Sequence, residues 1–305
     1  MPSPEFDAVL AAINAQPVTL PEDVHEARLR IDEMLGSSPL AEGVEVSTTT
    51  IGSLAAEWLV PSATVGRGVV LYLHGGGYRI GSIAGYRPLL SQFAAAFGMR
   101  LLAIDYRLAP EHPFPAAVDD ALAAYRWLLD HGTPASAIAV MGDSAGGGLA
   151  AACILAIKRA RLAQPGAVVC LSPFADLTLA ADSYRRNAAT DPYWNLTSAQ
   201  QAVTDYLGGA RPREPLASPV FGAFARTAPM LIHAAAGETL ADDAVHLASA
   251  VHRANGQVRC ELWPGLTHVW HAMYPHVPEA REAVDAVATF LHEHLDDVPP
   301  GGFAP

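Results

Sequence analysis

The chain has few cysteines, few charged side chains and no long apolar run. Only 3 of its 305 residues are cysteine, and 16% are charged. Cys153, Cys170 and Cys260 fall in apolar stretches without the spacing of a zinc site, so we interpret them as buried apolar residues and expect no metal. The longest apolar run, 149–157, is far too short to span a bilayer, and we therefore expect no membrane-spanning segment.

Positive charge is scarce as well. The chain carries 19 Lys and Arg residues against 31 Asp and Glu residues, which gives a formal net charge of −12. This balance repels nucleic acids and anionic membranes, so we expect neither as a partner. Residues 1–7 contain neither the basic nor the apolar part of a secretory signal, which favours a cytoplasmic protein. Apolar residues make up 51% of the chain, as is typical of a compact enzyme and not of a disordered chain.

The sequence does contain short apolar strands that alternate with amphipathic helices. This pattern predicts an α/β fold with a mostly parallel central sheet and helices on both faces. Two alternating stretches, 44–50 and 55–60, predict strands near a sheet edge, and the tail over 298–302 is expected to fray. Further strands are expected at 69–73, 101–104, 137–141, 168–171, 230–235 and 258–262, and helices at 24–35, 86–97, 116–129, 145–162, 242–254 and 278–294.

A Gly-Asp-Ser-Ala-Gly motif at 142–146 stands between a predicted strand and a predicted helix. In that setting Gly-x-Ser-x-Gly is the pattern of a nucleophile elbow, a tight turn that needs small residues on both sides of the serine. The helix that follows starts with its positive dipole end next to the hydroxyl. Ser144 is therefore the candidate nucleophile, and the alternative is a structural glycine-rich turn.

A second glycine-rich turn, His74-Gly75-Gly76-Gly77, follows the strand at 69–73. Successive glycines let backbone N–H groups approach a substrate oxygen with no side chain between them. The motif matches an oxyanion-hole loop that acts together with the N–H of the residue after the nucleophile, here Ala145. We expect His74 to hold this loop by hydrogen bonds and not to act as the base.

The base and the orienting acid are sought later in the chain, because this type of site follows the order Ser, acid, His. Among 12 histidines, His268 lies in the loop between the last predicted strand and the final helix, and His271 is its nearest rival. Glu238 lies in the loop that follows the strand at 230–236 and is the candidate acid. Asp242 is the alternative acid, although it directly precedes a predicted helix, where an N-cap is its ordinary role.

Over about residues 45–295, the chain resembles the hormone-sensitive-lipase-like carboxylesterases (bacterial family IV). The resemblance rests on Tyr72-Leu73-His74-Gly75-Gly76-Gly77-Tyr78, the run 105–117, Gly142-Asp143-Ser144-Ala145-Gly146-Gly147, Ser172-Pro173 and Gly265-Leu266-Thr267-His268. It implies the α/β-hydrolase fold in a single domain over 1–305, no cofactor, and oxyanion donors at Gly76, Gly77 and Ala145. The family usually has Asp in an Asp-Pro-Leu-x-Asp block. Aligning Leu240 and Asp242 with that block puts the acid at Glu238, a departure from the commoner Asp.

The segment 178–217 interrupts the alternation of strands and helices. It is interpreted as a lid or, alternatively, as a surface insertion without a role in the site. The resemblance implies a helical cap built from 1–43 and 178–217, and a possible homodimer through the edge of the last strand. Five aromatic residues are candidate pocket walls, although each is as typical of a core: Tyr78, Tyr184, Trp194, Phe221 and Trp270.

Together these features predict a serine carboxylesterase in which Ser144, His268 and Glu238 hydrolyse a small-molecule ester through an acyl-enzyme. The resemblance implies short- to medium-chain acyl esters. A lactone hydrolase or an amidase would use the same residues and stays an alternative. A non-catalytic small-molecule receptor of the same fold is the alternative of another class, and the presence of both Ser144 and His268 disfavours it.

Overall fold

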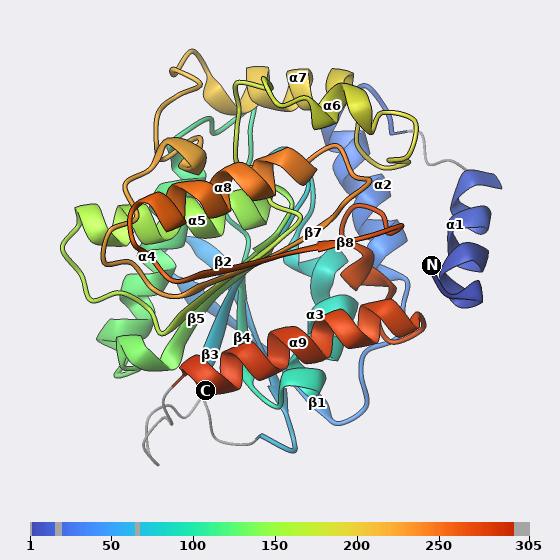
Figure 1. The fold of residues 1–305 in the computed structure, drawn as a ribbon. Helices are drawn as coiled ribbons and strands as arrows, with labels where there is room; N and C mark the ends of the chain where they lie inside the picture. Colours follow the sequence, from blue (N-terminus) through green and yellow to red (C-terminus); the bar gives the residue numbers. More distant parts are fainter. Residues whose placement is uncertain (1, 16–19, 65–67, 296–305) are drawn as a thin grey trace.

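The computed structural model describes residues 2–15, 20–64 and 68–295, so the tail expected to fray at 298–302 lies outside the described residues. Its centre is an 8-stranded sheet in the order β1-β2-β4-β3-β5-β6-β7-β8 (Figure 1). The antiparallel pairs β1–β2 and β2–β4 form one edge, and the remaining neighbours are parallel. The strands are β1 (Val44–Ile51), β2 (Leu54–Pro61), β3 (Val69–Leu73), β4 (Arg100–Ile104), β5 (Ile138–Asp143), β6 (Ala167–Leu171), β7 (Met230–Ala235) and β8 (Val258–Trp263).

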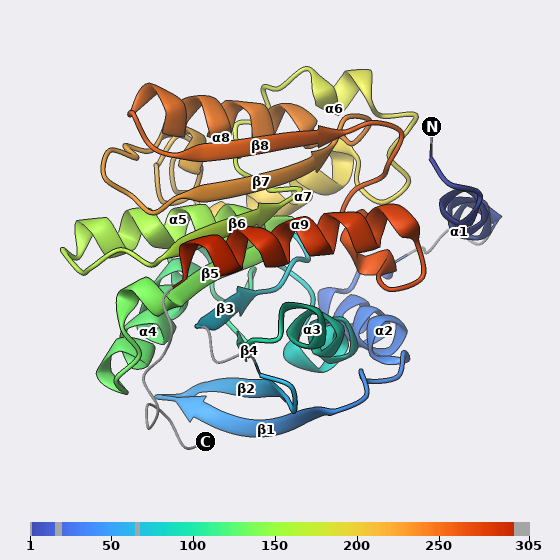
Figure 2. The same cartoon turned by 60° about the horizontal axis from the view of Figure 1, so that its bottom comes forward.

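Helices cover both faces of the sheet (Figure 2). Side chains of β3 alternate between the two layers: Val69 and Leu71 pack with α4, α5 and α8, while Val70 and Tyr72 pack with α3 and α9. This alternation is the period of two that a strand imposes on its side chains. The helices are α1 (Pro4–Ala15), α2 (Val24–Gly36), α3 (Ile83–Phe97), α4 (Ala116–Asp130), α5 (Ala145–Arg159), α6 (Ser183–Arg186), α7 (Leu196–Leu207), α8 (Ala241–Arg253) and α9 (Pro278–His294).

The structure confirms the predicted α/β architecture and shifts some element ends. Helix α3 begins at Ile83, ahead of the predicted position 86, because Ser82 Oγ accepts a hydrogen bond from the N–H of Gly85 and caps the helix there. Helix α5 ends at Arg159, short of the predicted position 162. The chain turns away just beyond it, where Arg161 adopts a positive φ of 57°.

The amino-terminal helices and the segment between β6 and β7 lie outside the sheet layers. Helix α1 packs against the start of α9, where Phe6 is buried and Ser3 Oγ donates to Glu279 Oε2 at 2.8 Å. Helix α7 lies over the loop that follows β3, because its Tyr206 stacks on Tyr78 with ring centroids 3.8 Å apart. In Figure 1, α6 and α7 run across the top of the molecule, and α1 stands at its side.

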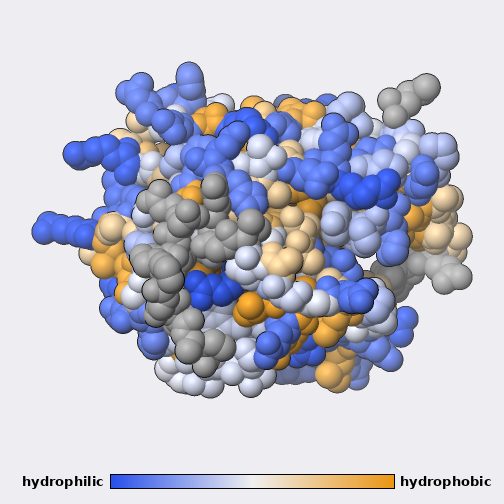
Figure 3. Space-filling view, turned by 90° about the horizontal axis from the view of Figure 1, so that it is seen from below, coloured by the Kyte–Doolittle hydropathy of each residue, from blue (hydrophilic) through white to orange (hydrophobic). Residues whose placement is uncertain are grey.

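The outer surface mixes polar and apolar side chains. Figure 3 shows them interspersed on the face seen from below, where hydrophilic residues surround smaller apolar areas. Among the described residues, no helix combines the length and the apolar composition that crossing a bilayer requires.

Candidate active site

Ser144 stands at the sharp turn between β5 and α5. Its backbone has φ 53° and ψ −119°, a conformation that L-residues rarely adopt. The turn is tight enough that a Cβ on Gly142 would overlap Gly146 O, and a Cβ on Gly146 would overlap Leu73 O. The N–H of Ser144 donates to Leu171 O at 2.8 Å, which fixes the turn to β6. The glycines therefore allow the turn, and the turn presents the serine hydroxyl at the start of α5.

The structure brings the three predicted triad residues together. Ser144 Oγ lies 3.0 Å from His268 Nε2, and His268 Nδ1 lies 3.4 Å from Glu238 Oε2. The His268 side chain is 9% exposed and that of Glu238 is fully buried. The second distance is longer than an ordinary charge-assisted hydrogen bond. A proton can pass from Ser144 to His268 in this geometry, while Glu238 faces the opposite ring nitrogen.

The two alternative triad residues point elsewhere. Asp242, in the first turn of α8, accepts from the N–H of Ser183 at 2.9 Å and pairs with Arg186 at 2.7 Å. His271 Nε2 lies 3.1 Å from His233 Nδ1, on a buried strand. Asp242 therefore ties α8 to the segment after β6, and His271 belongs to a buried pair of histidines.

Burial and charge act in opposite directions on the two buried triad members. Burial by itself would lower the pKa of His268, but the contact with the Glu238 carboxylate outweighs it, and the charges of Asp191 and Asp143 add to the effect, so the pKa is raised. Burial raises the pKa of Glu238, and the contacts with His268 and Ser172 oppose that shift. An imidazole accepts a proton only in its neutral form, so the raised pKa of His268 restricts that form to the basic side of its titration.

Ser172 connects the acid loop to the histidine loop. It follows β6 directly and is fully buried. Its Oγ donates to Glu238 Oε2 at 2.8 Å and accepts from the N–H of Val269 at 3.1 Å. In the sequence, Ser172 stands out only as part of a Ser-Pro motif. Its place directly after a parallel strand, at the edge where β5 and β7 also end, is the signal that could have marked it.

The loop after β3 carries the predicted oxyanion donors. Gly76 and Gly77 have φ values of 108° and 62°, and a Cβ on Gly76 would overlap Ile80 O, so this backbone requires glycine. Ala145 is the first residue of α5, where backbone N–H groups have no partner within the helix. His74 Nδ1 lies 2.7 Å from Gly75 O, as the predicted role in holding the loop requires.

Asp143 fixes this loop to the nucleophile turn. Its carboxylate accepts from the N–H of Gly75 at 3.0 Å, from Tyr72 Oη at 2.9 Å and from Tyr86 Oη at 2.9 Å. The side chain is buried, and these donors compensate for the loss of water. No sequence motif gives Asp143 a role of its own, and its place beside Ser144 is the one signal that could have marked it.

Three of the five candidate pocket aromatics lie in or beside the segment that covers the site. A Cβ on Gly77 would stand 3.0 Å from Trp194 Cη2, so the indole ring lies directly against the predicted oxyanion loop. Tyr78 is buried, and its ring lies beside Phe174, with centroids 6.3 Å apart. Tyr184 is 2% exposed and packs in the same apolar cluster. Trp194 is thus an aromatic ring in direct contact with the loop of the predicted oxyanion donors.

The other two aromatics pack against other parts of the fold than Trp194, Tyr78 and Tyr184 do. Phe221 is 37% exposed and stacks with Arg213, at the end of α8 that is remote from Glu238. Trp270 is fully buried in the cluster formed with Phe6 from α1. Phe221 lies in the turn ahead of β7, and Trp270 packs in the cluster that contains Phe6 of the amino-terminal helix.

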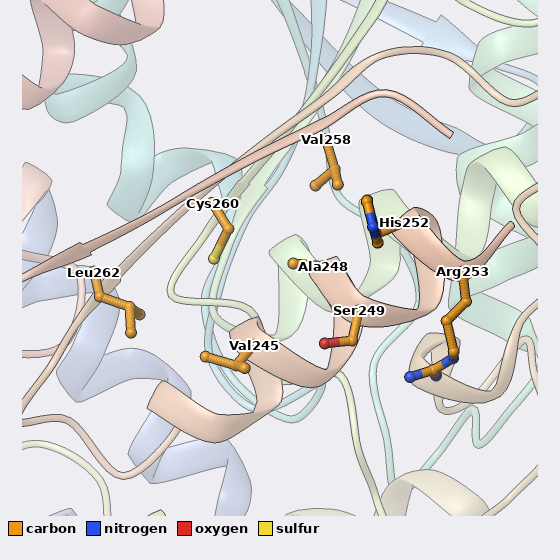
Figure 4. A pocket seen from close by; sticks show the side chains of 8 residues that line it. All are labelled: Val245, Ala248, Ser249, His252, Arg253, Val258, Cys260 and Leu262. Carbon is orange, nitrogen blue, oxygen red and sulfur yellow. The ribbon is translucent and has the colours of Figure 1, made fainter. Parts of the chain in front are cut away.

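A shallow depression of about 510 Å³ lies at the outer edge of the sheet, between α8 and β8. Figure 4 shows the side chains that line it, and no triad residue is among them. They are Val245, Ala248, Ser249, His252, Arg253, Val258, Cys260 and Leu262. Within the described part of the chain, no group of three or more His, Cys, Asp or Glu residues is arranged to hold a metal ion.

Comparisons with known proteins identify the family to which this fold belongs. Residues 70–272 match a family described by the alpha/beta hydrolase fold. An acetyl-hydrolase of Streptomyces hygroscopicus is 40% identical over 294 residues, 95% of this chain and 97% of the relative. An ethyl acetate hydrolase of Pseudomonas putida is 35% identical over 239 residues, 74% of this chain and 73% of the relative. A solved esterase of the bacterial hormone-sensitive lipase family matches with a TM-score of 0.92 at 40% identity, over 96% of this chain and 99% of that one.

The chain therefore belongs to the α/β-hydrolase family. Within that family it is a carboxylic ester hydrolase of the hormone-sensitive lipase group, which confirms the resemblance carried by its motifs.

Proposed function

We propose that the protein is a serine carboxylesterase that uses Ser144 as nucleophile, His268 as base and Glu238 as orienting acid. The observation that carries this proposal is the 3.0 Å contact between Ser144 Oγ and His268 Nε2 at a positive-φ turn, with Glu238 behind the imidazole. A serine hydroxyl becomes nucleophilic when an adjacent base takes its proton. The carboxylate keeps the correct tautomer of the base and stabilises the imidazolium that forms.

The reaction proceeds through an acyl-enzyme. Ser144 Oγ attacks the ester carbonyl carbon as its proton passes to His268 Nε2, and the carbonyl oxygen becomes an oxyanion bound by the N–H groups of Gly76, Gly77 and Ala145. Collapse of this intermediate breaks the bond to the alcohol oxygen, which takes the proton from His268. Water then attacks the acyl carbon while His268 takes its proton. Collapse of this second intermediate breaks the bond to Ser144 Oγ, which takes the proton from His268 as the carboxylic acid leaves.

The proposed substrates carry short acyl chains, at the small end of the short- to medium-chain range. Two features of the site support this proposal: Ser144 is only 6% exposed, and the Trp194 ring lies against Gly77. A relative that covers nearly the whole chain is named an acetyl-hydrolase. A pocket bounded by a rigid indole accommodates a short chain and clashes with a long one.

A series of p-nitrophenyl esters from acetate to palmitate tests the proposed activity and the acyl range together. We expect kcat/KM to be highest for acetate or butyrate and to fall by at least about 10-fold by octanoate, because each methylene that cannot be accommodated forfeits on the order of 1 kcal/mol. Trp194→Ala should move the optimum toward longer chains.

Phe221→Ala is the matched control for this series, because it removes an exposed aromatic ring that lies away from the triad. It should leave the optimum unchanged. An optimum at palmitate in the parent protein, or equal shifts in both variants, would contradict the short-chain proposal.

We also propose that two copies of the chain form a homodimer through β8. Within the described sheet, β8 is the last strand. Its Leu262 is 45% exposed, and Val245 on the neighbouring α8 is 38% exposed. An open strand edge is a template for pairing, and a twofold axis lets the same strand pair with its own copy.

Light scattering after size exclusion tests this proposal. We expect a dimer in the parent protein and a monomer in Leu262→Glu. Leu29→Glu, on the 73% exposed Leu29 of α2, should remain a dimer.

A further inference from the structure

Asp191 makes an unusually complete set of contacts between the segment after β6 and the acid loop. It precedes α7, and the residue is 8% exposed. Oδ2 accepts from the backbone N–H and from Oγ1 of Thr239, both at 2.9 Å. Oδ1 accepts from the N–H groups of Tyr193 and Trp194, both at 3.1 Å. Each oxygen of this carboxylate thus receives two donors, which compensate for its burial.

These and neighbouring hydrogen bonds connect residues 187–191, in the segment after β6, to the backbone on both sides of Glu238. Thr239 is the residue directly after Glu238, so Asp191 fixes the peptide that leaves the acid. Asn187 Nδ2 donates to Glu238 O at 2.7 Å, and Thr190 Oγ1 donates to Gly237 O at 2.7 Å. Residues 187–191 therefore hold three consecutive residues of the acid loop, Gly237, Glu238 and Thr239. The partners are 47 to 51 residues apart in sequence.

Asp191 also adds charge to the surroundings of His268. The negative groups that act on the imidazole are Glu238, Asp191 and Asp143, and each favours its protonated form. His271 is a further buried titratable group near the imidazole, and burial holds its pKa well below the usual range, so it adds no positive charge there. Charges in a buried site interact more strongly than in water, so a carboxylate that does not touch the imidazole still affects it.

We propose that Asp191 is a positioning residue of ester hydrolysis, which holds Glu238 in line with His268 and whose charge stabilises the imidazolium formed when Ser144 attacks. This inference rests on the proposed function. It assigns the segment after β6 a part in building the triad, in addition to covering it.

Asp191→Asn tests this role with little change of shape. The single carbonyl oxygen of Asn can serve one pair of donors, and its NH₂ group then faces the other pair, so the acid loop loses its anchor together with one negative charge. We expect kcat for p-nitrophenyl acetate to fall about 10- to 100-fold, since a small misplacement of a catalytic group costs up to about that factor. KM should change much less. The acidic limb of kcat/KM should move to lower pH, because an imidazole with fewer negative neighbours loses its proton more easily.

Asp182→Asn is the matched control. Asp182 lies in the same segment, its side chain is 82% exposed, and its contact is with Arg185 at 3.6 Å. Removing its charge should leave kcat and the acidic limb unchanged. Equal losses in the two variants, or an Asp191→Asn variant that matches the parent in kcat and in its acidic limb, would overturn the proposal.

A direct titration of His268 separates this inference from the proposed function. Nitrogen-15 NMR of the imidazole, with His268→Gln to assign the signal, should show a lower pKa in Asp191→Asn than in the parent and no change in Asp182→Asn. If Asp191→Asn lowered the melting temperature but left the pKa of His268 equal to that of the parent, Asp191 would have a structural role only. Failure of the proposed function would appear separately, as equal esterase activity in the parent and in Ser144→Ala.

Thr239→Val keeps the test decisive if Asp191→Asn does not fold. Valine removes the Oγ1 donor to Asp191 and keeps the shape, the backbone N–H and the charge of Asp191. We expect kcat to fall about 3- to 10-fold, in proportion to the loss of one hydrogen bond. An unchanged kcat in Thr239→Val would overturn the positioning role.

Discussion

Ser144→Ala should lower kcat for p-nitrophenyl acetate by on the order of 10⁵-fold, the largest effect of any single substitution in this chain. The variant loses the only atom that forms the acyl-enzyme. His268 Nε2, 3.0 Å away, then has no hydroxyl to deprotonate. The fold should persist, because Ser144 makes no side-chain cap on α5 and alanine keeps the Cβ at the same strained turn.

Three measurements make this prediction decisive. Thermal unfolding should give the same melting temperature for the parent and the variant. A fluorophosphonate should add its mass to the parent and not to Ser144→Ala. Ser249→Ala, which removes a hydroxyl from α8 at the edge depression, is the matched control and should retain full activity.

Two outcomes would overturn the assignment in different ways. A folded Ser144→Ala protein that still hydrolyses esters would place the nucleophile elsewhere. A folded parent that hydrolyses no ester and takes up no fluorophosphonate, while it binds a small molecule under α7, would favour the non-catalytic receptor.

The nucleophile turn was predictable from sequence because its requirements are local. The backbone of Ser144 needs small neighbours at Gly142 and Gly146, and both the need and the residues lie within one turn of chain. The positions of the strands along the chain were predictable for a similar reason, since each short apolar run is flanked by its own turn and helix signals. His268 followed from its place after the last strand, because parallel strands end at one edge of the sheet.

The choice between Glu238 and Asp242 needed contacts between distant segments. Both residues lie beyond the end of β7, and local pattern favoured Glu238 without excluding Asp242. What separates them in space is Arg186, which pairs with Asp242 from the segment after β6. A side chain's partner across the fold is not encoded in its neighbours along the chain, and this is why the alternative stayed open.

The same reason explains the aromatic residues and the positioning residues. Trp270 is buried because Phe6, at the other end of the chain, packs on its side of the sheet. Ser172 and Asp191 act through hydrogen bonds to Glu238 and Thr239, residues far away in sequence. Such groups carry no motif of their own, so only the folded structure reveals them.

Glu238→Gln should lower kcat by about 10³- to 10⁴-fold, the second largest effect expected. The amide has almost the shape of the carboxylate but no charge, so it does not stabilise the imidazolium. Its NH₂ group, where it faces Nδ1, also favours the wrong tautomer of His268. The pKa of His268 should fall, because the contact with Glu238 is what outweighs its burial. Residual activity should therefore extend to lower pH than in the parent.

Asp242→Asn is the comparison that decides between the two carboxylates. It removes a charge from the first turn of α8 and should change kcat by less than about 3-fold, because Asp242 pairs with Arg186 and not with His268. It should cost at most about 1 kcal/mol of stability, as is usual for an ion pair open to solvent.

Glu238→Asp should recover part of the activity lost in Glu238→Gln, since it restores the charge at a longer distance from Nδ1. If Asp242→Asn lost as much kcat as Glu238→Gln, the acid would have to be reassigned. If both variants kept full kcat, His268 would act without either carboxylate, and the 3.4 Å contact with Glu238 would be structural.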